Sequence, residues 1–143
     1  MKMNTVITAS LVLALSSLTL GAQKTKVVTA AQVNGVYGFY KVEFRVLALG
    51  HNKLKIQFDG VYVNIMKSVN TGYAEGEATI DGNIATFIPE DTQGCKITMT
   101  FVPGKLIVKQ DGSDADCGFG HNVYATGTYR KIRSGKPKFQ PAP

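Results

Sequence analysis

The residues with the most obvious chemical potential lie together near the C-terminal end of the chain. The run "DADCGFGHNVYATGTYRK", Asp114 to Lys131, holds carboxylates, a cysteine, glycines and a histidine in neighbouring positions. Such a set can ligate a metal ion, carry thiol chemistry, contact a partner, or form a stapled bend that closes a small domain. The residues that would form a partner-binding loop are Asp114, Asp116, Gly118, Phe119, Gly120 and His121.

Two of these four possibilities fit the spacing poorly. Asp111, Asp114, Asp116 and His121 supply hard ligands, but an EF-hand loop needs acids at alternate positions and a glutamate at its twelfth position. A thiol redox centre favours a C-x-x-C pair, which the chain lacks. We therefore predict no metal site and no cofactor here. A structural closure and a recognition loop remain, and one segment can serve as both.

Catalytic patterns are sparse elsewhere. The sequence contains no G-x-S-x-G, no H-E-x-x-H and no phosphate-cradling glycine loop. Its other histidine, His51, falls in a predicted turn. Glu75 and Glu77 would share one strand face and form a carboxylate pair of the kind glycosidases use, but a solvated strand face explains them more simply. The sequence predicts a protein that is not an enzyme.

The N-terminus indicates export. Lys2 precedes the uncharged apolar run "VITASLVLALSSLTL", and the small residues Gly21 and Ala22 follow it. This is the layout of a secretory signal peptide, here residues 1–22, and the run is shorter than the roughly 20 residues of a membrane span. The mature chain would be a single domain, residues 23–133, without a membrane span. Its two cysteines would form a disulfide, and its location would be periplasmic or secreted.

Charge is distributed unevenly along the 143 residues. The formal net charge is +6, yet all 10 acidic residues lie between Val27 and Tyr129, which leaves that part slightly acidic. A nucleic-acid-binding face would need clustered basic residues there, so no nucleic acid is expected as a partner. Residues 134–143, "SGKPKFQPAP", predict a flexible, basic, proline-rich tail that can make weak contact with an anionic surface.

Alternation of apolar and polar residues dominates the mature chain and predicts half-buried strands. No long amphipathic helix follows the signal peptide, and the connections are short, so neighbouring strands should pair antiparallel. We predict an all-β fold, a small up-and-down barrel of about eight strands (calycin-like), with a two-sheet sandwich as the alternative. The predicted strands are 36–48, 54–58, 61–66, 73–80, 84–88, 95–102, 105–110 and 123–131.

Three turn signals set the expected pairings. Asp59-Gly60 predicts a hairpin that turns Leu54, Ile56, Phe58, Val61, Val63 and Ile65 to one face. Asp81-Gly82 marks another turn, whose loop has either two residues or three. Val102-Pro103-Gly104-Lys105 predicts a tight turn. That turn brings Cys95 near position 112, a few residues before Cys117.

A disulfide between Cys95 and Cys117 would therefore clamp the open end of this last hairpin. It would also set the start of the final strand. Gly118 and Gly120 permit unusual backbone angles. Phe119, which lies between them, can turn inward and plug one end of the barrel.

The C-terminal third resembles a type of small exported bacterial β domain. The likeness rests on "CKITMTF", "GKLIVKQ", "DCGFG" and "GTYRK", with "NGVYGFY" fitting the opening strand. Some such domains accompany lysozyme-inhibitor-type modules of the bacterial envelope. The resemblance implies a compact periplasmic barrel. The chain lacks the Ser-containing "SASG"-like loop of barrel-type lysozyme inhibitors, so no inhibitory residues carry over.

Two functions from different classes follow. The first is a non-enzymatic periplasmic or secreted binding protein for a protein partner in the envelope or outside the cell, for example an inhibitor or immunity-type protein. The slightly acidic body suits a cationic partner. The second is a calycin-like carrier of a small apolar ligand. Eight strands leave room for one small ligand or for side chains alone, and the predicted inward phenylalanines favour side chains.

Overall fold

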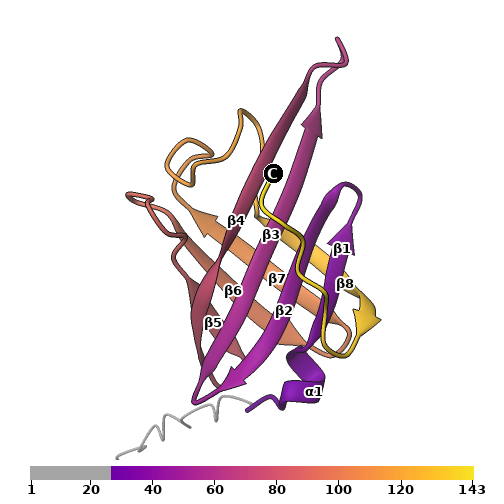
Figure 1. Cartoon of the computed structure of the whole chain (residues 1–143), viewed down its shortest axis with the longest axis vertical. Coiled ribbons are helices and arrows are strands. Elements are labelled where there is room, and N and C mark those ends of the chain that lie inside the picture. The colour runs from indigo at the N-terminus through magenta and orange to yellow at the C-terminus, as the bar shows by residue number, and fades with distance from the viewer. Residues whose placement is uncertain (1–26) are drawn as a thin grey trace, which may run out of the picture.

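The chain folds as a closed antiparallel barrel of eight strands (Figure 1), as the alternation predicted. The computed structural model describes residues 27–143, so the predicted signal peptide lies outside the described residues. Each strand pairs with its neighbour in sequence, and β8 closes the barrel on β1. The elements are α1 (Ala30–Val33), β1 (Gly35–Phe39), β2 (Val42–Gly50), β3 (Lys53–Val63), β4 (Val69–Asp81), β5 (Ile84–Phe87), β6 (Lys96–Val102), β7 (Lys105–Asp111) and β8 (Gly127–Ser134).

The short helix α1 lies across one end of the barrel (Figure 1). It begins at Thr29, whose hydroxyl accepts from the backbone N–H of Gln32 while the Gln32 side chain accepts from the backbone N–H of Thr29, a capping box. Val33 is buried in the core, and the Tyr37 hydroxyl donates to its carbonyl at 2.8 Å. These contacts fix α1 to the barrel and leave the opposite end for the loops described below.

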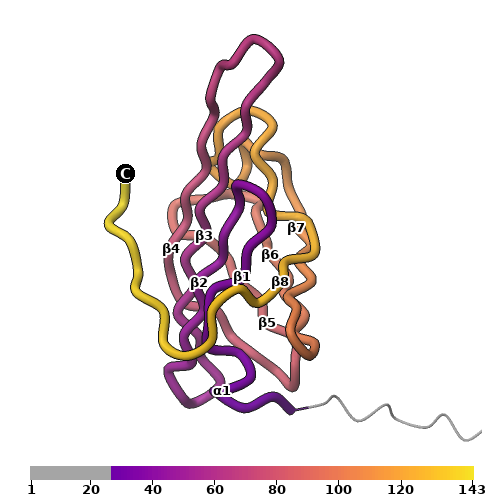
Figure 2. Tube along the Cα trace, turned by 90° about the vertical axis from the view of Figure 1, so that its right-hand side faces the viewer, coloured from indigo at the N-terminus to yellow at the C-terminus, as the bar shows by residue number. Residues whose placement is uncertain are grey.

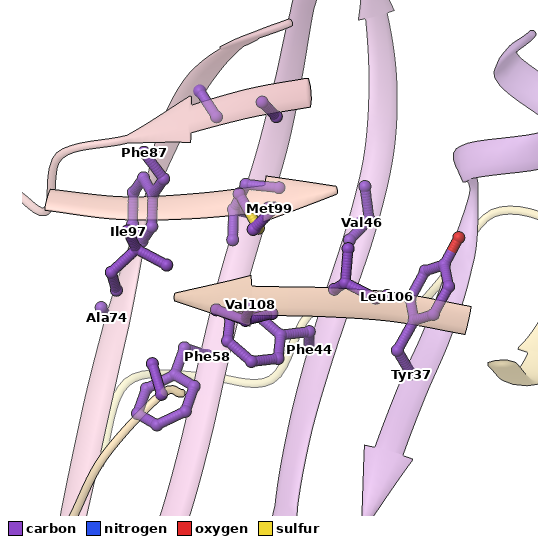
Figure 3. Packing of buried hydrophobic residues seen from close by; sticks show 14 of the residues in the cluster. Tyr37, Phe44, Val46, Phe58, Ala74, Phe87, Ile97, Met99, Leu106 and Val108 are labelled. Atoms are coloured by element: carbon purple, nitrogen blue, oxygen red, sulfur yellow. The ribbon is translucent and has the colours of Figure 1, made fainter. Parts of the chain in front are cut away.

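Aromatic and aliphatic side chains fill the barrel interior. Phe44, Phe58 and Met99 have no exposed surface, and Figure 3 shows them pointing into one common space. The ring of Phe44 packs against those of Phe58 and Tyr129, with centroids 5.0 Å apart in both pairs. Burial of these rings is the main apolar contribution to folding. The inward side chains thus occupy the space in which a carrier would hold its ligand.

The hairpin predicted at Asp59-Gly60 is wrong. β3 runs straight through these residues, and Gly60 pairs with Gly72 of β4. A Cβ at Gly60 would lie 2.7 Å from Cζ of Phe58 and 2.9 Å from Cγ1 of Val123. Gly60 is therefore needed for space inside the barrel end and not for a turn. The true hairpin tip lies at residues 64–68, so Ile65, which the sequence placed on the inward face, is fully exposed.

Other boundaries also differ from the predictions, among them the start of β4, which is Val69 and not 73. Segment 36–48 is two strands, β1 and β2, joined by a tight turn at Tyr40 and Lys41, with Tyr40 at φ 54°. The loop between β4 and β5 has two residues, which is one of the two predicted lengths, but these are Gly82 and Asn83, because Asp81 belongs to β4 and pairs with Ile84. β8 starts at residue 127 and not at 123, because the chain before it is used to close the barrel end.

Gly72 gives a direct test of the closely packed barrel end. A Cβ there would lie 2.7 Å from Cγ1 of Val123 and 3.0 Å from Cγ of Phe119. Gly72→Ala is expected to lower the free energy of unfolding by about 1–3 kcal/mol through overpacking, measured by urea denaturation. Thr71→Ala, an exposed neighbour on the same strand, should change it by only about 0.5 kcal/mol. Equal effects for both variants would contradict this packing.

Candidate functional site

The two cysteines form a disulfide, as predicted. The Cys95 and Cys117 sulfurs are 2.07 Å apart, and their Cα atoms are 4.9 Å apart. The predicted turn at Pro103-Gly104 is also present, since Val102 pairs with Lys105. The bond joins the chain just before β6 to residues 112–126, which connect β7 to β8 and are called the disulfide loop here.

The two aspartates of the disulfide loop hold its backbone in place. Asp114 accepts from the backbone N–H of Asn122 at 2.6 Å and from that of Ala115 at 2.8 Å. Asp116 accepts from both the backbone N–H and the hydroxyl of Ser113 at 2.8 Å. These hydrogen bonds favour the charged carboxylates and lower the pKa of both aspartates from the usual 3.8. In this arrangement both carboxylates order the loop.

Phe119 closes this end of the barrel from within the loop. It is 6 % exposed, and its ring centroid lies 4.7 Å from that of Phe58. Gly120 donates its N–H to the Thr71 carbonyl at 2.9 Å, and a Cβ there would lie 2.7 Å from that oxygen. Gly118 has φ 69°, a conformation that favours glycine. The two glycines therefore let the chain insert the ring, as the sequence suggested, and we call Phe119 the plug.

The six predicted partner-binding residues separate into two groups. Asp114, Phe119 and Gly120 are committed to the loop and the core. Asp116 and Gly118 are exposed, and the His121 side chain is 82 % exposed, with Nδ1 3.6 Å from Oδ2 of Asp114. The accessible part of the disulfide loop is thus small and polar.

Large apolar side chains are exposed at the same end of the barrel. The turn between β1 and β2, the tip between β3 and β4, and the disulfide loop all lie opposite α1 (Figures 1 and 2). The β3–β4 tip projects farthest. We call the exposed side chains of these three segments the apolar tips: Phe39, Tyr40, Ile65, Met66 and Tyr124, with exposed fractions of 66 %, 86 %, 101 %, 82 % and 48 %.

Sequence reasoning missed the apolar tips because Tyr40 and Ile65 continue the alternation of the strands predicted there. Phe39 and Tyr40 stood within a predicted continuous strand, and Ile65 stood on a predicted inward face. The left-handed backbone at Tyr40 and Lys67 turns the chain at residues where no glycine or proline marked a turn. No local signal in the sequence would have identified these positions.

Glu75 and Glu77 do lie on one face of β4, but each is already paired. Glu75 accepts from the Lys55 ammonium at 2.6 Å and from the Tyr73 hydroxyl at 2.5 Å, while Glu77 pairs with Lys53 at 2.8 Å. Lys55 and Tyr73 lower the pKa of Glu75 through these hydrogen bonds. A general acid of a glycosidase needs a raised pKa, so Glu75 does not suit that role.

The two histidines lie at opposite ends of the barrel. His51 is in the β2–β3 turn at the α1 end, whereas His121 is in the disulfide loop at the opposite end.

Among residues 27–143, no three side chains of the His, Cys, Asp and Glu types come together as a metal site. A surface hollow of about 220 Å³ opens at the α1 end and is lined by Val28, Gln32, Phe101, Val102, Pro103, Gly104 and Lys131.

Asp114 should make part of the protein's stability depend on pH. Its pKa is lower in the folded state, so its contribution is present above the usual value of 3.8 and is lost as pH falls through the lower folded value. We expect Asp114→Asn to be less stable than wild type at neutral pH but to lose less stability between about pH 6 and pH 2.5. Urea midpoints across this range measure the difference, and parallel curves for the two proteins would contradict it.

Comparison with protein-family models, curated proteins and solved structures finds no match for this chain. The resemblance to small exported envelope domains therefore stays a prediction. None of the helices in the described part of the chain has both the length and the apolar character needed to cross a bilayer.

Proposed function

We propose that this chain is a non-enzymatic binding protein of the periplasm or the cell exterior. In this proposal it contacts a protein partner through the recognition end, defined as the apolar tips together with Asp116, Gly118 and His121. The observation that carries the proposal is that the apolar tips gather at one end of the barrel, beside an ordered polar loop. Clustered exposed apolar side chains are typical of interaction sites.

The chemistry of the recognition end suits a protein interface. Aromatic residues and methionine are enriched in interface cores, while polar residues form the rim. The disulfide and the aspartate hydrogen bonds already order the loop, so binding would cost less conformational entropy there. Packed side chains occupy the barrel interior, so we place the binding surface outside it and not in a carrier's cavity.

Charge indicates the kind of partner. Glu90 and Asp91 lie in the β5–β6 loop and line one hollow with Cys117 and Gly118 of the disulfide loop, which also carries the exposed Asp116. These exposed carboxylates favour a cationic protein, and complementary charge speeds encounter. An inhibitor or immunity-type protein that binds an envelope-acting protein fits this description.

Site-specific photo-crosslinking in the producing cell tests the proposal. A photoreactive phenylalanine analogue at Tyr40 or Ile65 should crosslink to one envelope or extracellular protein. The same group at His51 or Lys105, at the α1 end, is the matched control and should not. Equal adducts from both ends would argue against a recognition end.

Affinity for the captured partner then tests the side chains themselves. Ile65→Asp with Met66→Asp should weaken binding of the purified partner by about tenfold or more, because hot-spot residues of this type contribute most of the affinity. Both positions are fully or almost fully exposed, so the fold should be unaffected. Unchanged affinity would remove the apolar tips from the interface.

A further inference from the structure

Gln57 is a polar residue that is fully buried on the outside of the barrel. Its neighbours in β3, Ile56 and Phe58, point into the core, so its own side chain points outward, between Arg45 of β2 and Glu75 of β4. An outward side chain at this position should be solvated. It is covered instead by residues 135–143, the C-terminal segment, which runs along the outer face of the barrel (Figures 1 and 2).

The Gln57 amide binds the main chain of the C-terminal segment at one residue. Gln140 donates its backbone N–H to Oε1 of Gln57 at 2.9 Å, and Nε2 of Gln57 donates to the Gln140 carbonyl at 2.8 Å. Nε2 also lies 3.1 Å from the Tyr73 hydroxyl and 2.9 Å from Oε2 of Glu75, which orient the amide. This paired contact imitates that of an adjacent strand and does not depend on the side chain of residue 140.

The neighbouring contact adds a preference for an aromatic residue. The Lys55 ammonium lies 4.5 Å from the ring centroid of Phe139, within the range of a cation–π interaction. Pro137 and Pro141 flank the contact residues, and proline could not replace Gln140 because it has no N–H to donate. The bound pattern is an aromatic residue followed by a residue with a free N–H, in an extended segment.

A surface hollow lies beside the C-terminal segment at Ala142. Its volume is about 570 Å³, and it is lined by Leu49, Lys55, Tyr73, Glu75, Gly76, Glu77 and Glu90. Glu75 and Glu77 in this hollow already pair with Lys55 and Lys53, so Glu90 is its carboxylate that favours a cationic occupant. The C-terminal segment itself carries Lys136 and Lys138. A cationic segment bound in this hollow would therefore lie beside Glu90.

We propose that Gln57 is the centre of a second binding site, which receives an extended, cationic segment of a protein partner. The chain's own C-terminal segment occupies the site until the partner displaces it. Gly135, at φ 85°, gives the bend by which this segment leaves β8. The site lies on the side of the barrel, so the proposal does not depend on the recognition end. The flexibility predicted for residues 134–143 would allow this exchange.

Binding of a labelled peptide tests the second site. The probe is the synthetic peptide SGKPKFQPAPKK, the chain's own last ten residues with two added lysines, measured by fluorescence anisotropy. Gln140→Pro in the full chain removes the N–H that holds the C-terminal segment, so this variant should bind the peptide about tenfold more tightly than wild type. A peptide with proline in place of its glutamine is the matched control and should not bind.

A second substitution distinguishes binding at this site from nonspecific binding of the peptide. Adding Gln57→Ala to Gln140→Pro should abolish peptide binding, with an unchanged far-UV circular dichroism spectrum. In the single variant Gln57→Ala, trypsin should cleave after Lys138 about tenfold faster than in wild type, because the C-terminal segment is released. Equal binding of both peptides, persistent binding without Gln57, or no binding to Gln140→Pro would each overturn the proposal. Ile65→Asp with Met66→Asp should leave this binding intact.

Discussion

Replacing Phe119 with alanine is expected to lower the free energy of unfolding by about 3–5 kcal/mol. The plug is almost fully buried, packs on Phe58 with ring centroids 4.7 Å apart, and fills the slot left by Gly72. Its removal leaves a cavity at the barrel end that the rigid, paired strands cannot collapse to fill. Urea denaturation followed by circular dichroism measures the loss.

Phe39→Ala is the matched control for this prediction. The residue type is the same and the end of the barrel is the same, but Phe39 is 66 % exposed. Its removal should change the stability by only about 0.5 kcal/mol. If both variants lose the same amount, Phe119 does not act as a plug.

Removing the disulfide is the second large effect. Cys95 and Cys117 are separated by 22 positions, and closing a loop of that size stabilises a domain by about 3 kcal/mol in the chain-entropy model. Both residues are buried, so the double variant Cys95→Ala with Cys117→Ala avoids burying a hydroxyl. For a chain of this length, the melting temperature should fall by about 10–20 °C.

Chemical reduction provides the control for the double variant. Wild-type protein with a reductant should melt at nearly the same temperature as the double variant, whose own melting temperature should not respond to the reductant. If the reductant frees both thiols of the wild-type protein, as alkylation would show, and the melting temperature stays unchanged, then the disulfide does not stabilise the fold.

The two variants also separate folding from binding at the recognition end. The disulfide and the plug lie beneath the accessible residues Asp116, Gly118 and His121. Losing either should therefore disorder the disulfide loop and weaken a partner's binding indirectly. His121→Ala should leave stability unchanged, because its side chain is 82 % exposed, and it tests contact with the partner alone.

Several features of the site were accessible to sequence reasoning because they depend on short-range rules. The turn at Pro103-Gly104 has residues that suit its backbone angles, and the register it sets brings the two cysteines together. The insertion of Phe119 followed from the flanking glycines. The contact of Gln57 with Gln140 could not be predicted, because the two are 83 residues apart and no local pattern joins them.

Alternation of apolar residues was by itself enough to determine an all-β chain. Short connections and edges to hide favoured a barrel over a two-sheet sandwich, and the structure shows the closed barrel. The tertiary structure decided where the strands turn. The predicted number of strands was right because two errors cancel. Segment 36–48, predicted as one strand, is two, and the two strands predicted on either side of Asp59-Gly60 are the single strand β3. A glycine looks the same in sequence whether it permits a left-handed turn, as Gly82 does, or leaves space for a ring, as Gly60 does. Only the packed neighbours distinguish these two uses of glycine. The same packing decided that Ile65 is exposed and where the apolar tips lie.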